Sequence, residues 1–116
     1  MLEVEGNVVV IKPKKPYLDW IISQPDPPEE LRLEELQNDC TAFLIPEFAD
    51  YDSARKYVLS HYAKIFELEL EAWYADENLW PSGRSQRMFE EWFNVEVHSV
   101  VYGLFGENGS NMEDMQ

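Results

Sequence analysis

Apolar residues follow the spacing of β-strands in three separate segments of this chain. Residues 7–12 form a run rich in β-branched side chains that ends at Pro13, which predicts a buried strand. Residues 41–45 are apolar and are closed by Pro46, and residues 95–102 first alternate and then become continuously apolar. These segments predict three strands.

The N-terminal residues 2–5 alternate between apolar and acidic ahead of Gly6 and Asn7. A two-residue turn that begins with glycine would pair this segment with the following strand as a hairpin. The alternative is a frayed terminus, and the residues leave both possibilities open.

Helical spacing is clearest in the middle of the chain. Either Asp50 or Asp52 can cap the start of this helix. We expect it to run for about 22–26 residues and to end near residues 76–78, and a kink within it is left open. The apolar residues that recur at helical spacing are Ala54, Val58, Ile65, Phe66, Leu70 and Trp73.

Shorter helices are predicted around prolines and a serine cap. One follows Pro16, one begins at Pro28 with acidic residues in its first turn, and one is capped by Ser85 and ends near Phe93. The proline and glycine of residues 79–84 predict a loop before this last helix.

The order of these elements predicts the α+β class. Because short strands need a cover, we expect one small sheet of three to four strands with helices packed mainly on one face. We expect residues 1–105 to form a single α+β domain. Residues 106–116 have no periodicity, which predicts a disordered polar tail. The strand order is left open.

Composition narrows the classes of function. The chain has 116 residues, of which 45% are hydrophobic, enough for the core of one domain. It carries 9 Lys+Arg against 23 Asp+Glu, a net charge of −14, which disfavours nucleic acid and anionic lipid as partners. The longest apolar run, residues 8–11, falls far short of the roughly 20 residues that a membrane span needs. We therefore expect no nucleic-acid and no membrane partner.

The chain contains one cysteine, Cys40, which cannot form an internal disulfide. A reducing compartment, the cytoplasm, is therefore expected. Cys40 begins an apolar stretch without an evident base nearby, so we interpret it as a small buried hydrophobe and not as a nucleophile. No glycine motif for phosphate binding is present, and no cofactor is expected.

Acidic residues and a histidine form one candidate metal site. Glu67 and Glu71 lie four residues apart and share a face of the long helix, and Glu96 and His98 share a face of the last strand. If the helix packs beside that strand, these side chains would converge on a divalent cation that holds a water molecule. The alternative is a solvated helix face beside a half-buried strand histidine.

Basic residues in this acidic chain form a candidate ligand-binding site. Lys14 lies in a proline-rich loop, and Arg84 and Arg87 flank a helix start. If they converge beside Trp80, they would form a small anion pocket with an aromatic wall. The alternative is that the cations pair with nearby carboxylates and Trp80 locks its loop. His61 is interpreted as a histidine at the edge of the core and not as a catalytic base.

Four segments of the chain carry a recognisable pattern. They are Lys-Pro-x-x-Pro-Tyr-Leu-Asp-Trp-Ile at 12–21, Leu-Ile-Pro-Glu at 44–47, Leu-Trp-Pro at 79–81 followed by Arg84, and Phe-x-x-Trp-Phe-x-Val-Glu-x-His-Ser at 89–99. These segments resemble small acidic bacterial proteins of unassigned function. The resemblance implies a compact bacterial-type domain and no particular chemistry. The residues that it marks for inspection are Asp19, Glu47, Arg84, Glu96 and His98.

The predicted function is a small acidic module that binds another protein or a second copy of itself, for example as a homodimer. An exposed sheet edge or the loop that carries Trp80 would form the contact. The alternative is a small ligand-binding protein or a metal-dependent enzyme that uses the arginine site or the carboxylate and histidine site.

Overall fold

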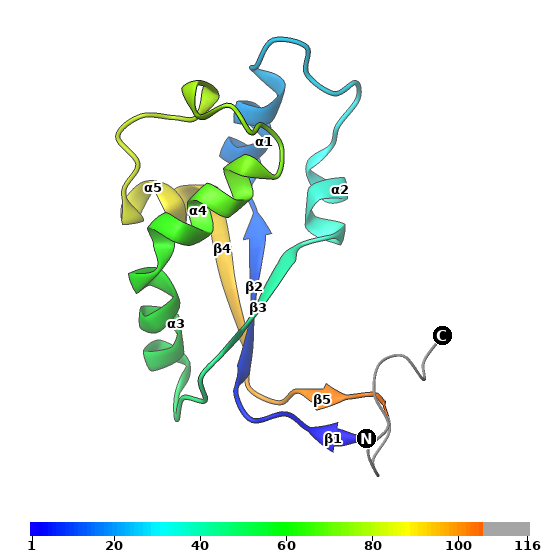
Figure 1. The fold of residues 1–116 in the computed structure, drawn as a ribbon, viewed down its shortest axis with the longest axis vertical. Helices are drawn as coiled ribbons and strands as arrows, with labels where there is room; N and C mark the ends of the chain where they lie inside the picture. Colours follow the sequence, from blue (N-terminus) through cyan, green and yellow to red (C-terminus); the bar gives the residue numbers. More distant parts are fainter. Residues whose placement is uncertain (106–116) are drawn as a thin grey trace.

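The computed structural model describes residues 1–105 of the chain. The tail predicted for residues 106–116 lies outside the described residues. A three-stranded sheet lies beside a layer of helices, and a separate two-stranded ribbon projects beyond the end of the sheet (Figure 1). The α+β class, with one small sheet and helices packed on it, is confirmed.

The central strand of the sheet is β2 (Asn7–Pro13). It pairs with β3 (Thr41–Ile45) on one side and with β4 (Phe93–His98) on the other, and both pairings are antiparallel. Odd positions of β2, among them Val9 and Ile11, are fully buried, whereas its even positions are partly exposed on the opposite face. The β-branched run predicted as a buried strand thus forms the middle of the sheet.

Helices cover the odd-numbered face of the sheet, and α3 packs against β4 (Figure 1). The helix α2 contacts β2 and α1. The helices are α1 (Lys15–Ile22), α2 (Leu33–Asn38), α3 (Tyr51–Ser60), α4 (Tyr62–Glu71) and α5 (Gln86–Trp92), with a 3₁₀ turn, η1 (Glu77–Leu79), before α5.

The core between the sheet and the helices is aromatic. Phe66 of α4 contacts Phe89 and Trp92 of α5 and Phe93 of β4, with ring centroids 5.2 to 5.7 Å apart. Tyr17 of α1 packs on Phe93 with centroids 4.8 Å apart. Large rings fill volume efficiently in a small domain, and these rings join three helices to one strand.

The long helix predicted in the middle of the chain is divided into α3 and α4 at His61. The Ser60 hydroxyl donates to the carbonyl of Tyr57 at 2.5 Å, and Nδ1 of His61 lies 2.9 Å from the same oxygen. The backbone N–H of His61 donates to the carbonyl of Val58 instead. Because side chains compete for the carbonyl that this N–H would use in a continuous helix, the helix tightens and changes direction here.

Both possibilities for the N-terminal residues are wrong. The strand β1 (Leu2–Glu3) pairs with β5 (Tyr102–Gly103), not with β2. The two strands form a ribbon that projects from the lower end of the sheet in Figure 1. The strand predicted over residues 95–102 is therefore two elements, because the chain leaves β2 after His98 to join β1.

Candidate functional site

The structure does not bring the predicted metal ligands together. Glu67 and Glu71 lie on α4, over the odd-numbered face of the sheet, whereas Glu96 and His98 project from the even-numbered face. Glu96 lies 3.8 Å from the ammonium group of Lys12 instead. Within residues 1–105, no group of three or more histidine, cysteine or acidic side chains could hold a metal ion. The predicted metal site is therefore wrong, because the sheet lies between the two glutamates of α4 and the Glu96 and His98 pair of β4.

The basic residues of the predicted anion pocket lie at opposite ends of α5. Nζ of Lys14 donates to the carbonyl of Glu90 in the last turn of α5 at 2.7 Å. Arg84 and Arg87 lie at the start of that helix, which is about 10 Å long at 1.5 Å per residue. The four predicted residues therefore do not form one pocket, and Lys14 instead stabilises the C-terminal end of α5.

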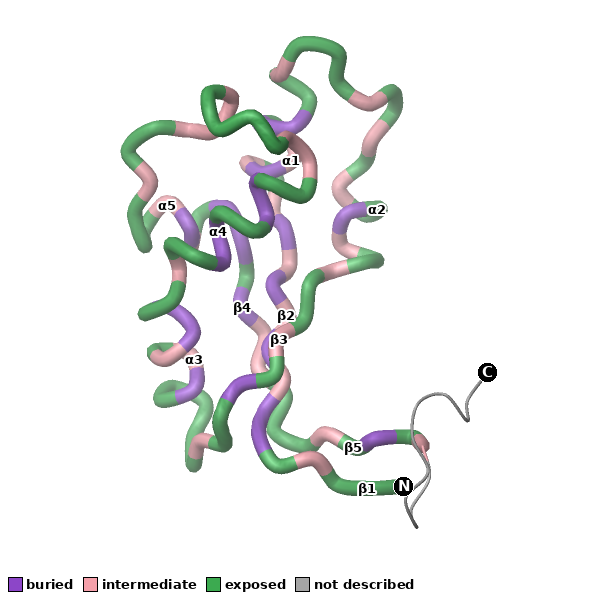
Figure 2. Tube along the Cα trace, in the orientation of Figure 1, coloured by how far each residue is buried: buried purple, intermediate pink, exposed green. Residues whose placement is uncertain are grey.

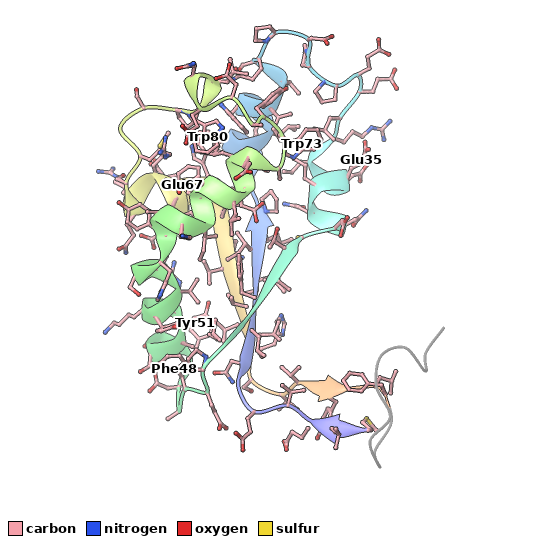
Figure 3. All side chains as sticks on the ribbon, in the orientation of Figure 1. Glu35, Phe48, Tyr51, Glu67, Trp73 and Trp80 are labelled. Atoms are coloured by element: carbon pink, nitrogen blue, oxygen red, sulfur yellow. The ribbon has the colours of Figure 1, made fainter. Side chains whose placement is uncertain are left out.

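The contacts of Trp80 support the interpretation that it locks its loop. Its indole N–H donates to the carbonyl of Tyr74 at 2.7 Å, and the ring packs against the core. The guanidinium of Arg84 lies 5.6 Å from the ring centroid and donates to the carbonyl of Pro81. Arg84 also lies 4.0 Å from Glu67, which together with Trp80 is labelled in Figure 3. These side chains are engaged with one another and with their own loop.

The thiol of Cys40 points back toward α2. Its sulfur lies 3.1 Å from the carbonyl of Gln37, to which it donates. Burial raises the pKa of the Cys40 thiol, so the protonated form is favoured. Cys40 is only partly buried, so the prediction of a small buried hydrophobe is wrong in its burial.

The register of the sheet determines which backbone groups point outward. The N–H of Lys14 donates to the carbonyl of Trp92, which continues the pairing of β2 with β4 by one residue. Even-numbered residues of β2 therefore direct their N–H and C=O groups toward β4, and odd-numbered residues direct theirs toward β3. Thr41, Phe43 and Ile45 of β3 lie opposite the odd positions of β2, and their backbone groups bond to β2. Ala42 and Leu44 therefore direct their backbone groups away from the sheet.

The β3 edge of the sheet is open. Among the described residues, the N–H and C=O groups of Ala42 and Leu44 have no hydrogen-bond partner. The strand contains neither a charged residue nor a proline, and the Leu44 side chain is 62% exposed. Figure 2 shows β3 as largely exposed or intermediate up to its last residue. An edge of this kind is a template for another strand.

The β4 edge is covered. The hydroxyl of Tyr51, at the start of α3 (Figure 3), donates to the outward carbonyl of Val95 at 3.1 Å. The N–H of Phe93 donates to the carbonyl of Phe89 at the end of α5. Both Phe93 and Val95 are buried. Two helices thus occupy the side of β4 on which another strand would have to pair.

An apolar groove of about 200 Å³ lies between β3 and the helices α3 and α4. Its floor includes Val9, Phe43 and Ile45, and its wall is formed largely by apolar residues of the two helices. Among residues 1–105, the groove is lined by two basic side chains, His61 and Lys64, and by no acidic side chain. The groove and the open edge are adjacent, since Phe43 and Ile45 belong to both.

The break between α3 and α4 places His61 at the groove. The imidazole packs on Tyr57 with ring centroids 4.6 Å apart, and Nδ1 must donate to the carbonyl of Tyr57, since that oxygen only accepts. The residue is exposed and not buried at the edge of the core. Sequence analysis missed the groove and Lys64, because a single lysine on an amphipathic helix usually belongs to its solvated face.

Glu69 of α4 is a buried acidic residue near the first residue of β3. The residue is 6% exposed, and Oε1 has no hydrogen-bond partner among the described residues. Burial raises the pKa of this carboxyl, and a hydrogen bond from Thr41 partly opposes the rise. Nothing in the sequence around Glu69 indicates this burial, since glutamate side chains are rarely buried.

No protein-family model, curated protein or solved structure matches this chain. Among residues 1–105, no helix combines the length and the apolar character that crossing a membrane requires. The geometry of the β3 edge and its groove is therefore the basis for the functional proposal.

Proposed function

We propose that this chain is a protein-interaction module that binds an extended segment of a partner protein along β3. The observation that carries the proposal is the open β3 edge beside an apolar groove. Recognition of a peptide by addition to a sheet edge needs these two parts, because backbone hydrogen bonds provide affinity and side-chain pockets provide specificity.

A strand added to β3 would use both parts at once. The N–H and C=O groups of Ala42 and Leu44 supply two donors and two acceptors for the incoming backbone. Side chains of the added strand alternate between the two faces of the sheet. Those on the helical side enter the groove next to Phe43, where they are removed from water.

We further propose that the module works in the cytoplasm and that its partner is neither nucleic acid nor an anionic membrane. A single cysteine suits a reducing compartment. A net charge of −14 repels phosphate groups, which a nucleic-acid partner or an anionic lipid surface would present.

The test is selection of peptides from a displayed random library on the full chain, followed by binding measurements on variants of Ala42. We expect Ala42→Pro to lower the affinity of selected peptides by at least about tenfold, since it removes an outward donor. The matched control Ala42→Val keeps the donor and should retain binding. Amide hydrogen exchange should slow at Ala42 and Leu44 when peptide binds.

Two results would overturn the proposal. One is selected peptides that bind Ala42→Pro as tightly as the wild-type chain. The other is a stable dimer in light scattering that Ala42→Pro converts to a monomer, because a second copy would then occupy the edge.

A further inference from the structure

On the basis of the proposed function, we infer that the groove selects a partner segment that carries an acidic side chain, and that Lys64 and His61 bind its carboxylate. The occupant is thus an extended peptide with apolar and acidic residues on the same face. Three features support this assignment: the charge of the groove, the lack of other partners for the Lys64 ammonium group and for Nε2 of His61 within residues 1–105, and the spacing of these two residues.

The charge of the groove is opposite to that of the whole chain. The sequence has 23 acidic residues and a net charge of −14, yet His61 and Lys64 are the ionisable side chains that line the groove together with Tyr57. Both basic residues are exposed, so an incoming carboxylate forms a surface ion pair with them, which is strengthened where the apolar walls exclude water. The groove therefore favours acidic ligands although the protein as a whole repels them.

Lys64 has no acidic partner among residues 1–105. Within the described part of the chain, five basic side chains pair with carboxylates at 2.9 to 4.0 Å, whereas Lys64 makes no ion pair. It is thus a lysine without a salt bridge in a chain where carboxylates outnumber cations. The carboxylate of a partner therefore binds this ammonium group without the breaking of an existing ion pair.

His61 presents a second ring nitrogen for the same carboxylate. Its Nδ1 is held by the Tyr57 carbonyl and contacts the Ser60 hydroxyl, whereas Nε2 makes no hydrogen bond within residues 1–105. The contact with Tyr57 fixes the ring orientation. In its protonated form the imidazole donates from Nε2.

The spacing of the two residues fits one carboxylate beside one apolar side chain. His61 and Lys64 are separated by one helical turn and share a face of the helix. Side chains two residues apart in an added strand lie on the same face, about 7 Å apart. One of them meets the basic pair while the other lies over Phe43 in the apolar part of the groove.

A second copy of the chain is a poorer fit. Its β3 strand, Thr41–Ile45, contains no acidic residue and so brings no carboxylate to Lys64. Two chains that each carry a charge of −14 also repel one another.

The experiment measures fluorescence anisotropy with labelled peptides of about seven residues in which valine and threonine alternate. One valine on the groove side is replaced by glutamate, glutamine or lysine, and the peptide ends are blocked so that the glutamate carries the peptide's carboxylate. We expect the glutamate peptide to bind the wild-type chain at least about tenfold more tightly than the glutamine peptide, and the lysine peptide to bind least.

Charge reversal at Lys64 is the decisive variant. Lys64→Glu should invert the preference, so that the lysine peptide binds more tightly than the glutamate peptide. Lys56→Glu, at an exposed position of α3 outside the groove, is the matched control and should leave the preference unchanged. Lys64→Gln, which keeps most of the side chain, should abolish the preference without inverting it.

The outcomes separate the inference from the proposed function. Equal binding of the three peptides, with loss of binding in Ala42→Pro, overturns the selection for acid and supports strand addition. An equal change of preference in Lys56→Glu and Lys64→Glu overturns the assignment to the groove, because bulk charge would explain it. Failure of every peptide to bind overturns both.

Discussion

The two edges of the three-stranded sheet have the same backbone chemistry and opposite surroundings. In β4, the N–H of Phe93 is bound by the end of α5 and the C=O of Val95 by Tyr51, whereas within residues 1–105 the outward groups of Ala42 and Leu44 in β3 have no hydrogen-bond partner. Burial on the helical face follows the same division, since Val95 of β4 is 2% exposed whereas Phe43 of β3 is half-buried. The difference is that the β4 edge is engaged within the fold, whereas the β3 edge faces solvent, and our proposal places the partner there.

The position of the helices explains this difference. The chain leaves β3, passes Phe48 and starts α3 against β4, on the far side of the central strand. From there α4 and α5 stay with β4 through the aromatic contacts around Phe66. The helical layer therefore leaves the outer edge of β3 uncovered, and the groove lies between β3 and the helices α3 and α4.

The largest effect should come from proline at an inward position of β3. We expect Phe43→Pro to lower the free energy of unfolding by about 3 kcal/mol, because it removes a ladder hydrogen bond with β2. Ala42→Pro, one residue away, should change it by less than about 1 kcal/mol. Urea unfolding of both variants measures the two free energies, and Phe43→Ala shows how much of the first loss comes from the missing ring. Equal losses of stability at both positions would show that the backbone groups of Ala42 do not point outward.

The next effect concerns the buried carboxyl beside β3. Because burial raises the pKa of Glu69 above its ordinary value of 4.5, the folded chain binds this proton more tightly than the unfolded chain. The resulting stabilisation is complete below pH 4.5 and is lost as the pH rises through the folded-state pKa. Glu69→Gln cannot ionise, and at neutral pH we expect it to be about 1 kcal/mol more stable than the wild type.

Urea unfolding across a pH series tests this expectation, with Glu67→Gln as an exposed control on the same helix. The difference between Glu69→Gln and the wild type should grow with pH, whereas the control should run parallel to the wild type. A Glu69→Gln curve that is parallel to the wild type at all pH values would contradict the assignment.

An effect of similar size is expected when the cover of β4 is weakened. Tyr51→Phe removes the hydroxyl that donates to Val95 and should lower the free energy of unfolding by about 1 kcal/mol. Amide exchange should rise along β4 and stay unchanged at Ala42 and Leu44. Unchanged stability together with unchanged exchange in β4 would argue that Tyr51 does not protect this edge.

The smallest effect on stability is expected at the open edge itself. Leu44→Lys should alter the free energy of unfolding by less than about 0.5 kcal/mol, since the side chain is mostly exposed. A lysine on an edge strand opposes pairing with another strand, so peptide binding should weaken. His98→Lys, at an exposed position of β4, is the control, and equal weakening in both variants would remove the distinction between the edges.

Local patterns in the chain predicted the elements that build the core. The β-branched run of β2 and the spacing of Ala54, Val58, Ile65 and Phe66 are properties of neighbouring residues, and burial of one face follows from them. The serine cap of α5 was likewise predictable, since Ser85 accepts from the N–H of Met88. The break at His61 was not, because Ser and His side chains seldom displace a helical hydrogen bond.

The candidate site depended on contacts between distant parts of the chain. Periodicity alone predicted β3 as a strand, and the absence of charge in Thr41–Ile45 was the one local sign of an unprotected edge. Whether that strand lies at an edge, and whether Lys64 faces a groove or open solvent, depends on which strands pair and where the helices pack. Local composition fixes which residues avoid water, but the arrangement that leaves β3 uncovered comes from long-range packing, which no short segment of the chain encodes.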